Sequence, residues 1–83
     1  MGVTRSDISG WFDQGVRAMN THMIVVCDTY DYEDYPVYFN GTAVEARDKV
    51  AKLNSESMQR VMEVYNLSMA RDPQLNQNRA FNY

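Results

Sequence analysis

Residues 22–39 read HMIVVCDTYDYEDYPVYF, two apolar segments separated by an acidic segment rich in tyrosine. The first apolar segment, residues 23–27, is short, β-branched and apolar at every position, which predicts a strand covered on both faces. The second, residues 37–39, predicts a strand that begins at Pro36, because proline lacks the backbone donor that a central strand needs. The whole stretch therefore predicts a long hairpin whose loop occupies residues 28–36.

The residues before this hairpin predict a helix that ends near Asn20. Ser6 or Thr4 can cap its first turn through a side-chain oxygen, and asparagine is a plausible stop because it tolerates the left-handed conformation. Apolar or small residues at helical spacing mark one buried stripe. The predicted stripe consists of Ile8, Trp11, Phe12, Gly15, Val16 and Met19.

The residues after the hairpin predict a second helix. Asn40 and Gly41 mark a turn, and Thr42 with Glu45 three residues later forms a capping box, so the helix is expected to begin at Ala43. It is expected to end near residue 54. Its predicted apolar face consists of Ala43, Ala46, Val50 and Leu53.

The spacing of apolar residues between 58 and 69 fits a helical stripe and a strand equally. We predict a strand at about 60–67, because a third strand completes a hairpin that is marginal alone. A right-handed crossover then places it beside the first strand and antiparallel to it, in the order 2-1-3. Asp72-Pro73 predicts the cap and first turn of a brief helix, and about 76–83 predicts a polar tail.

The fold class that follows is α+β: one small domain over residues 1–83, in the order α-β-β-α-β with a short further helix and a three-stranded antiparallel sheet. With 83 residues, of which 45% are hydrophobic, the chain is too short for two cores and buries only a thin one. We expect a homo-oligomer, because two short helices leave one face of the central strand for another subunit to cover.

Charge and composition exclude several classes of function. Residues 1–46 carry seven acidic side chains against two arginines, and no basic residue lies between Arg17 and Arg47, which argues against nucleic-acid binding. Residues 47–83 carry six basic side chains against four acidic ones. The longest apolar run has five residues, against about 20 for a spanning helix, so no membrane segment is expected. A single cysteine and the absence of a signal peptide predict a cytoplasmic location.

Three blocks of the sequence, HMIVVCDTYDYEDYPVYF (22–39), MQRVMEVYNLS (58–68) and RAFNY (79–83), resemble a set of short uncharacterised proteins of bacteria and their phages. The resemblance covers most of the chain. It implies a compact, phage-compatible domain, and it transfers no catalytic residue.

The acidic, tyrosine-rich loop is the main candidate binding site. Tyrosine offers a large and rigid contact area, and together with carboxylates it suits recognition of a protein with a basic groove. The alternatives are that the tyrosines pack on the hairpin, or that the acids are solvated. A hard cation is a further alternative, but the loop lacks the spacing and glycine of an EF-hand, so no metal site is predicted. The candidate residues are Asp28, Tyr30, Asp31, Tyr32, Glu33, Asp34 and Tyr35.

Two other groups of residues could serve small-molecule chemistry. Aromatic residues could stack a base while arginines hold a phosphate. The residues are Trp11, Tyr30 and Tyr65 with Arg60, Arg71 and Arg79. No glycine-rich phosphate loop supports this hypothesis. Cys27 and His22 could form a nucleophile and base, but their spacing along one strand places them on opposite faces. Cys27 and His22 are expected to be structural.

We therefore expect a non-enzymatic binding module without a cofactor. A phage accessory or counter-defence protein that binds a host protein, or that sequesters a small, polar, nucleotide-like ligand, fits the loop and the resemblance. The predicted binding residues are those of the loop with Arg60 and Arg79. The alternatives are a small metal-assisted or thiol enzyme and a purely structural assembly subunit.

Overall fold

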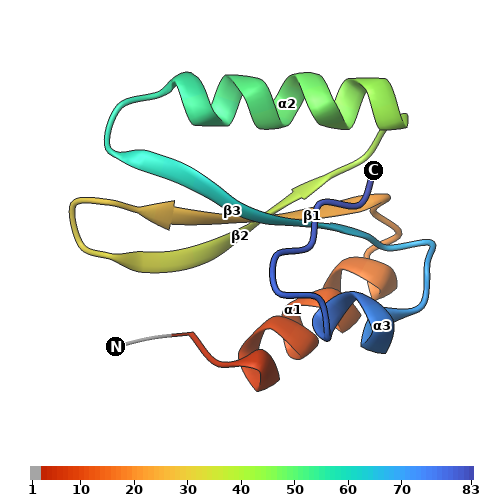
Figure 1. Cartoon of the computed structure of the whole chain (residues 1–83). Helices are drawn as coiled ribbons and strands as arrows, with labels where there is room; N and C mark the ends of the chain where they lie inside the picture. Colours follow the sequence, from red (N-terminus) through yellow and green to blue (C-terminus); the bar gives the residue numbers. More distant parts are fainter. Residues whose placement is uncertain (1–2) are drawn as a thin grey trace.

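The computed structural model describes residues 3–83 and places three helices on the two faces of a three-stranded antiparallel sheet (Figure 1). The strand order is β2-β1-β3. This confirms the predicted fold class, the order of the elements and the central position of the strand formed by residues 23–27. The elements are α1 (Arg5–Arg17), β1 (His22–Asp28), β2 (Glu33–Phe39), α2 (Ala43–Ser55), β3 (Gln59–Asn66) and α3 (Arg71–Leu75).

The central strand β1 separates two small cores. Met23 and Val25 pack on the side of α1 and α3, and Ile24 and Val26 pack on the side of α2. In Figure 1, α2 lies above the sheet and α1 and α3 lie below it. Helices of the same chain therefore cover both faces of β1. A homo-oligomer was expected because one face of the sheet was predicted to be uncovered, and that reason no longer holds. The homo-oligomer itself stays a prediction.

Helix α1 begins with a capping box on Thr4, so Thr4 rather than Ser6 is the cap. Its hydroxyl accepts from the Asp7 backbone N–H at 3.2 Å, and the Asp7 carboxylate accepts from the Thr4 N–H at 3.0 Å. The helix ends at Arg17, earlier than predicted, and Met19 takes the left-handed conformation that we assigned to Asn20 (φ 63°). Because Met19 lies beyond the helix, its side chain is exposed and does not belong to the buried stripe.

Other positions of that stripe divide between core and surface. Ile8, Phe12 and Gly15 are buried as predicted. Trp11 is only partly buried and Val16 is exposed, because they lie at the two margins of the face formed by the buried residues. The predicted stripe was therefore too wide.

Strand β2 begins at Glu33, three residues earlier than predicted. Pro36 pairs with Val25 in the middle of β2 instead of starting it. Because β2 is an edge strand, the missing N–H of Pro36 is tolerated there. The hairpin loop is therefore residues 29–32 rather than 28–36.

Helix α2 starts at the predicted capping box. The Thr42 hydroxyl accepts from the Glu45 N–H at 3.2 Å, and the Glu45 carboxylate accepts from the Thr42 N–H at 2.8 Å. That backbone hydrogen bond lowers the pKa of Glu45. The predicted apolar face is buried except for Ala43, which lies in the first turn and is exposed.

Strand β3 confirms the predicted third strand and contains a β-bulge. Val25 pairs with Glu63 and Val26 pairs with Val61, so Met62 has no partner on β1. The bulge turns both Val61 and Val64 toward α2, while Met62 packs on the side of α1.

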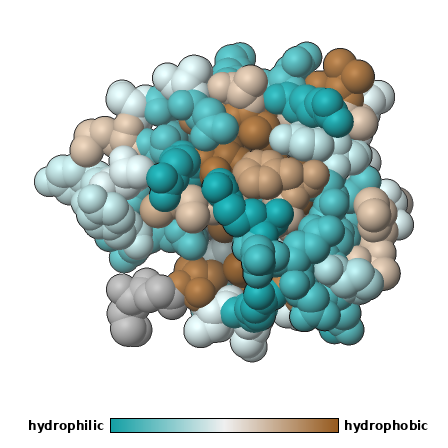
Figure 2. All heavy atoms as spheres, in the orientation of Figure 1, coloured by the Kyte–Doolittle hydropathy of each residue, from teal (hydrophilic) through white to brown (hydrophobic). Residues whose placement is uncertain are grey.

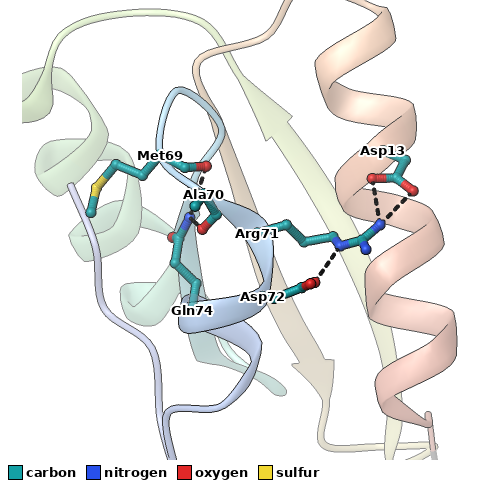
Figure 3. A network of polar contacts seen from close by, with 6 residues as sticks. All are labelled: Asp13, Met69, Ala70, Arg71, Asp72 and Gln74. Carbon is teal, nitrogen blue, oxygen red and sulfur yellow. Dashed lines mark hydrogen bonds and ion pairs between the residues drawn. The ribbon is translucent and has the colours of Figure 1, made fainter.

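Helix α3 begins at Arg71 with Ala70 as its N-cap, so Asp72 lies in the first turn and is not the cap. Arg71 reaches across to α1, where its guanidinium contacts the Asp13 carboxylate at 2.9 Å, and it also contacts Asp72 at 2.8 Å (Figure 3). The Arg71–Asp13 ion pair attaches α3 to α1 on one side of the sheet.

Candidate protein-interaction site

The turn between β1 and β2 is shaped by Asp28. Its carboxylate accepts from the backbone N–H groups of Tyr30 at 2.8 Å and Asp31 at 3.4 Å. Its carbonyl accepts from the Tyr32 N–H at 2.6 Å. Tyr32 itself takes the left-handed conformation with φ 57°, which is uncommon for a bulky residue. These contacts hold the turn so that the side chains after Asp28 project from the sheet.

Three large side chains are exposed together at this end of the molecule. Tyr30 and Tyr32 are 73% and 77% exposed, and Met58 is 55% exposed. Met58, the residue before β3, lies next to the turn between β1 and β2, because the Thr29 N–H donates to the Met58 carbonyl at 2.9 Å. We call this surface the hairpin tip, which consists of Tyr30, Asp31, Tyr32, Glu33 and Met58.

The carboxylates of the hairpin tip have no basic partner in the described part of the chain. Asp31 and Glu33 are exposed, and both ion pairs found among residues 3–83 are made by Arg71. The hairpin tip therefore combines exposed apolar groups with unneutralised negative charge. A basic surface that also offers apolar contact is the complement of this combination.

The other predicted loop residues have structural roles. Asp28 builds the turn, and Asp34 lies in β2 opposite Cys27. The Tyr35 hydroxyl donates to the Gln59 side chain at 3.1 Å, and that amide is held in turn by the Leu53 carbonyl at 2.8 Å. The sequence hypothesis that some tyrosines pack on the hairpin therefore fits Tyr35, but not Tyr30 or Tyr32.

Cys27 and His22 point to opposite faces of β1 and have separate surroundings, as their spacing indicates. Cys27 is 8% exposed, and burial, then the neighbouring Asp34 carboxylate, raises the pKa of its thiol. His22 contacts the Thr21 hydroxyl at 2.8 Å and the Tyr83 carbonyl at 3.4 Å. The two residues do not form a nucleophile and base in one chain.

The aromatic residues and arginines proposed for a nucleotide-like ligand are not assembled into one site. Tyr65 is 2% exposed, and burial and a hydrogen bond to Glu63 raise the pKa of its hydroxyl. Arg60 pairs with Cys27 at the hairpin end of β3, whereas Arg79 stacks on Phe81 at 5.3 Å, beside the middle of β3.

A shallow, open groove of about 360 Å³ follows the outer face of α1. None of the arginines proposed to hold a phosphate lines it, although Trp11 does. The lining residues are Ser6, Asp7, Gly10, Trp11, Gln14 and Arg17. The wall carries one acidic side chain, Asp7, and one basic side chain, Arg17, so it offers an anion no net positive charge.

Residues 3–83 contain no group of three or more carboxylate, imidazole or thiol side chains that could hold a metal ion. None of the helices described is long and apolar enough to cross a membrane.

Comparisons with models of known protein families, with curated proteins and with solved structures give no match. Sequence reasoning found the tyrosines and acids of the hairpin tip but missed Met58, because a methionine before a strand carries no signal of exposure.

Proposed function

We propose that this protein is a non-enzymatic binding module whose hairpin tip docks on a basic surface of a partner protein. The observation that carries the proposal is the joint exposure of Tyr30, Tyr32 and Met58 beside carboxylates without ionic partners. Aromatic residues and methionine are enriched in protein interfaces. The resemblance to short phage proteins favours a host protein as the partner.

The turn geometry supports binding by a preformed surface. Because Asp28 holds the turn with hydrogen bonds from Tyr30 and Asp31, less backbone freedom is lost on binding. The two exposed tyrosines have few rotatable bonds, so they also lose little side-chain entropy. Sequestration of a nucleotide-like ligand is less well supported, since its proposed residues lie apart.

Affinity capture with matched variants tests this function. The purified chain and its Asp31→Ala/Tyr32→Ala variant are immobilised and exposed to host extract, and the captured proteins are compared by mass spectrometry. We expect a partner that the variant binds at least about tenfold more weakly, the effect typical of an interface hot spot. Binding of that purified partner should also weaken as salt concentration rises, because exposed charges are screened.

The control removes one exposed apolar and one exposed acidic side chain elsewhere. Val44 and Asp48 lie on the outer face of α2, away from the hairpin tip, and both are exposed. Val44→Ala/Asp48→Ala should leave capture unchanged. Equal capture by the chain and by the hairpin-tip variant, with both folded by circular dichroism, contradicts the proposal.

A further inference from the structure

A short segment after α3 runs along the outer edge of β3. We call residues 80–83 the strap. The Val64 N–H donates to the Ala80 carbonyl at 2.7 Å, and the Asn82 N–H donates to the Val64 carbonyl at 3.0 Å, so Phe81 and Val64 form a parallel bridge. The strap crosses in front of β3 in Figure 1. The predicted polar tail is thus partly ordered against the sheet.

The side chains of the strap contact both sides of the sheet. Ala80 is 0% exposed and belongs to the core beneath α1 and α3, where a charged side chain would be buried. On the other side, the Tyr83 ring packs against the core beneath α2 and lies 4.8 Å from the Arg47 guanidinium. Side chains that contact the two sides of a sheet, with backbone hydrogen bonds between them, resemble the way in which sheet edges recognise extended peptides.

The groove that receives the strap is built from polar groups in fixed positions. Gln74 is 2% exposed, and its amide N–H groups donate to the carbonyls of Asn66 at 2.8 Å and Ala70 at 3.0 Å. Figure 3 shows this amide held by the loop before α3. Its oxygen accepts from the Asn66 N–H at 2.8 Å and from the Asn82 side chain at 3.1 Å. The Asn66 side chain donates to the Tyr83 carbonyl at 3.1 Å.

The link between α3 and the strap is exposed, and its side-chain contacts are to the strap itself, from Gln77 to Asn82 at 3.0 Å and from Arg79 to the Phe81 ring at 5.3 Å. Residues 76–79 are all exposed and belong to no helix or strand. In the orientation of Figure 1, Figure 2 shows hydrophobic residues in the middle of this face, bordered by hydrophilic ones. A sheet edge covered by a short strap on an exposed link is an arrangement in which two copies can exchange straps without loss of contacts, because each groove is refilled by an identical strap.

We propose that the outer edge of β3 is a binding groove for an extended peptide of the pattern Ala-x-Asn-aromatic, and that its ligand in trans is the strap of a second copy. The groove residues are Arg47, Glu63, Val64, Asn66 and Gln74. Within one chain the strap fills its own groove. When the link is too short for the strap to reach the groove of its own chain, two chains exchange straps reciprocally. This dimer is independent of the hairpin tip.

The first test asks whether the groove binds the peptide in trans. A fluorescent peptide of residues 78–83 (NRAFNY) is titrated by anisotropy with the full chain and with its Ala80→Arg variant, whose own strap cannot enter. Because a tethered strap competes at roughly millimolar effective concentration, we expect the variant to bind the peptide at least about tenfold more tightly. The same peptide with arginine in place of its alanine should not bind.

A second variant keeps the test decisive if Ala80→Arg does not fold. Asn82→Ala/Tyr83→Ala removes the side-chain contacts of Asn82 and Tyr83 and leaves every groove residue intact, so its weakened strap should compete less and the variant should also bind the NRAFNY peptide more tightly than the unaltered chain. Equal binding by the altered and unaltered chains, or no binding by any of them, overturns the groove.

The second test forces exchange. Deleting Gln77 and Asn78 shortens the link by about 7 Å of extended chain, so the strap cannot reach its own groove, and light scattering should show a dimer. Adding Ala80→Arg to the deletion should restore a monomer. A monomeric deletion variant overturns exchange between copies. Asp31→Ala/Tyr32→Ala should change neither result, so failure of the strap proposal and failure of the proposed function are distinguishable.

Discussion

Replacing Gln74 by leucine should cost a large part of the stability of this protein. The buried amide makes three hydrogen bonds of 3.0 Å or less, to the backbone N–H and carbonyl of Asn66 and to the carbonyl of Ala70. A typical hydrogen bond contributes about 0.5 to 1.5 kcal/mol net, and a buried backbone group left unpaired costs about 1 to 3 kcal/mol. Leucine has a similar volume but satisfies none of these groups. We therefore expect a loss of about 2 to 4 kcal/mol.

This loss is large for a chain of 83 residues. At about 0.05 to 0.15 kcal/mol per residue, the free energy of unfolding is about 4 to 12 kcal/mol. Urea denaturation followed by circular dichroism measures the change. The unfolding free energy falls by about 1 to 3 kcal/mol per molar urea, so the midpoint of the urea transition should fall by roughly 1 M or more.

The matched control is Gln77→Leu. Gln77 is exposed, and its side chain accepts one bond from Asn82 at 3.0 Å. Its replacement should cost less than about 1 kcal/mol. The reasoning is refuted if Gln74→Leu costs less than about 1 kcal/mol, or no more than the control.

Three further predictions concern packing and titration. Gly10→Ala should stabilise the protein by about 0.5 to 1 kcal/mol, because an added Cβ meets nothing within 4 Å. Gly15→Ala should destabilise the protein by about 1 to 3 kcal/mol, because its Cβ would lie 2.7 Å from Leu67. Thermal unfolding measures both effects. The raised pKa of Tyr65 implies stability that is present below about pH 10 and is lost as pH rises through the folded-state pKa. Above pH 10, urea titrations should therefore show the chain losing about 1.4 kcal/mol per pH unit more than Tyr65→Phe does. Burial and a raised pKa make Cys27 slow to react, so its alkylation by iodoacetamide at pH 8 should be at least about tenfold slower in the native chain than in urea.

Each of these has an opposing result. Equal effects of the two glycine substitutions would show that the core near Leu67 is loose. Parallel pH profiles for the chain and Tyr65→Phe would mean that the buried hydroxyl does not resist ionisation. Alkylation of native Cys27 at the rate of the unfolded chain would show an accessible, reactive thiol, in conflict with its burial.

The β-bulge explains why residues 58–69 were ambiguous in the sequence. Val61 and Val64 face the same core although they are three residues apart, a spacing that a regular strand cannot produce and a helix does. The extra residue, Met62, shifts the alternation by one position. Pairing with β1 produces this shift, so residue periodicity could not reveal it.

The candidate site was predictable in part. The acidic and aromatic composition of residues 28–36 identified the region, but the division of its side chains depended on where β2 begins. Once β2 starts at Glu33, Asp34 lies beside Cys27 and Tyr35 is held by Gln59. Tyr30 and Tyr32 remain exposed because they belong to the turn itself.

Local chemistry in the sequence determined the starts of α1 and α2, the central strand and the order of the elements, because capping boxes, β-branched runs and turn residues act over a few neighbouring positions. The tertiary structure alone decided which faces are covered, where Met58 lies and how Gln74 and Asn66 receive the strap. Those contacts join residues of different helices, strands and loops, so their geometry depends on the register of the sheet and the docking of α3. A polar residue such as Gln74 becomes buried only when every one of its partners is already in place.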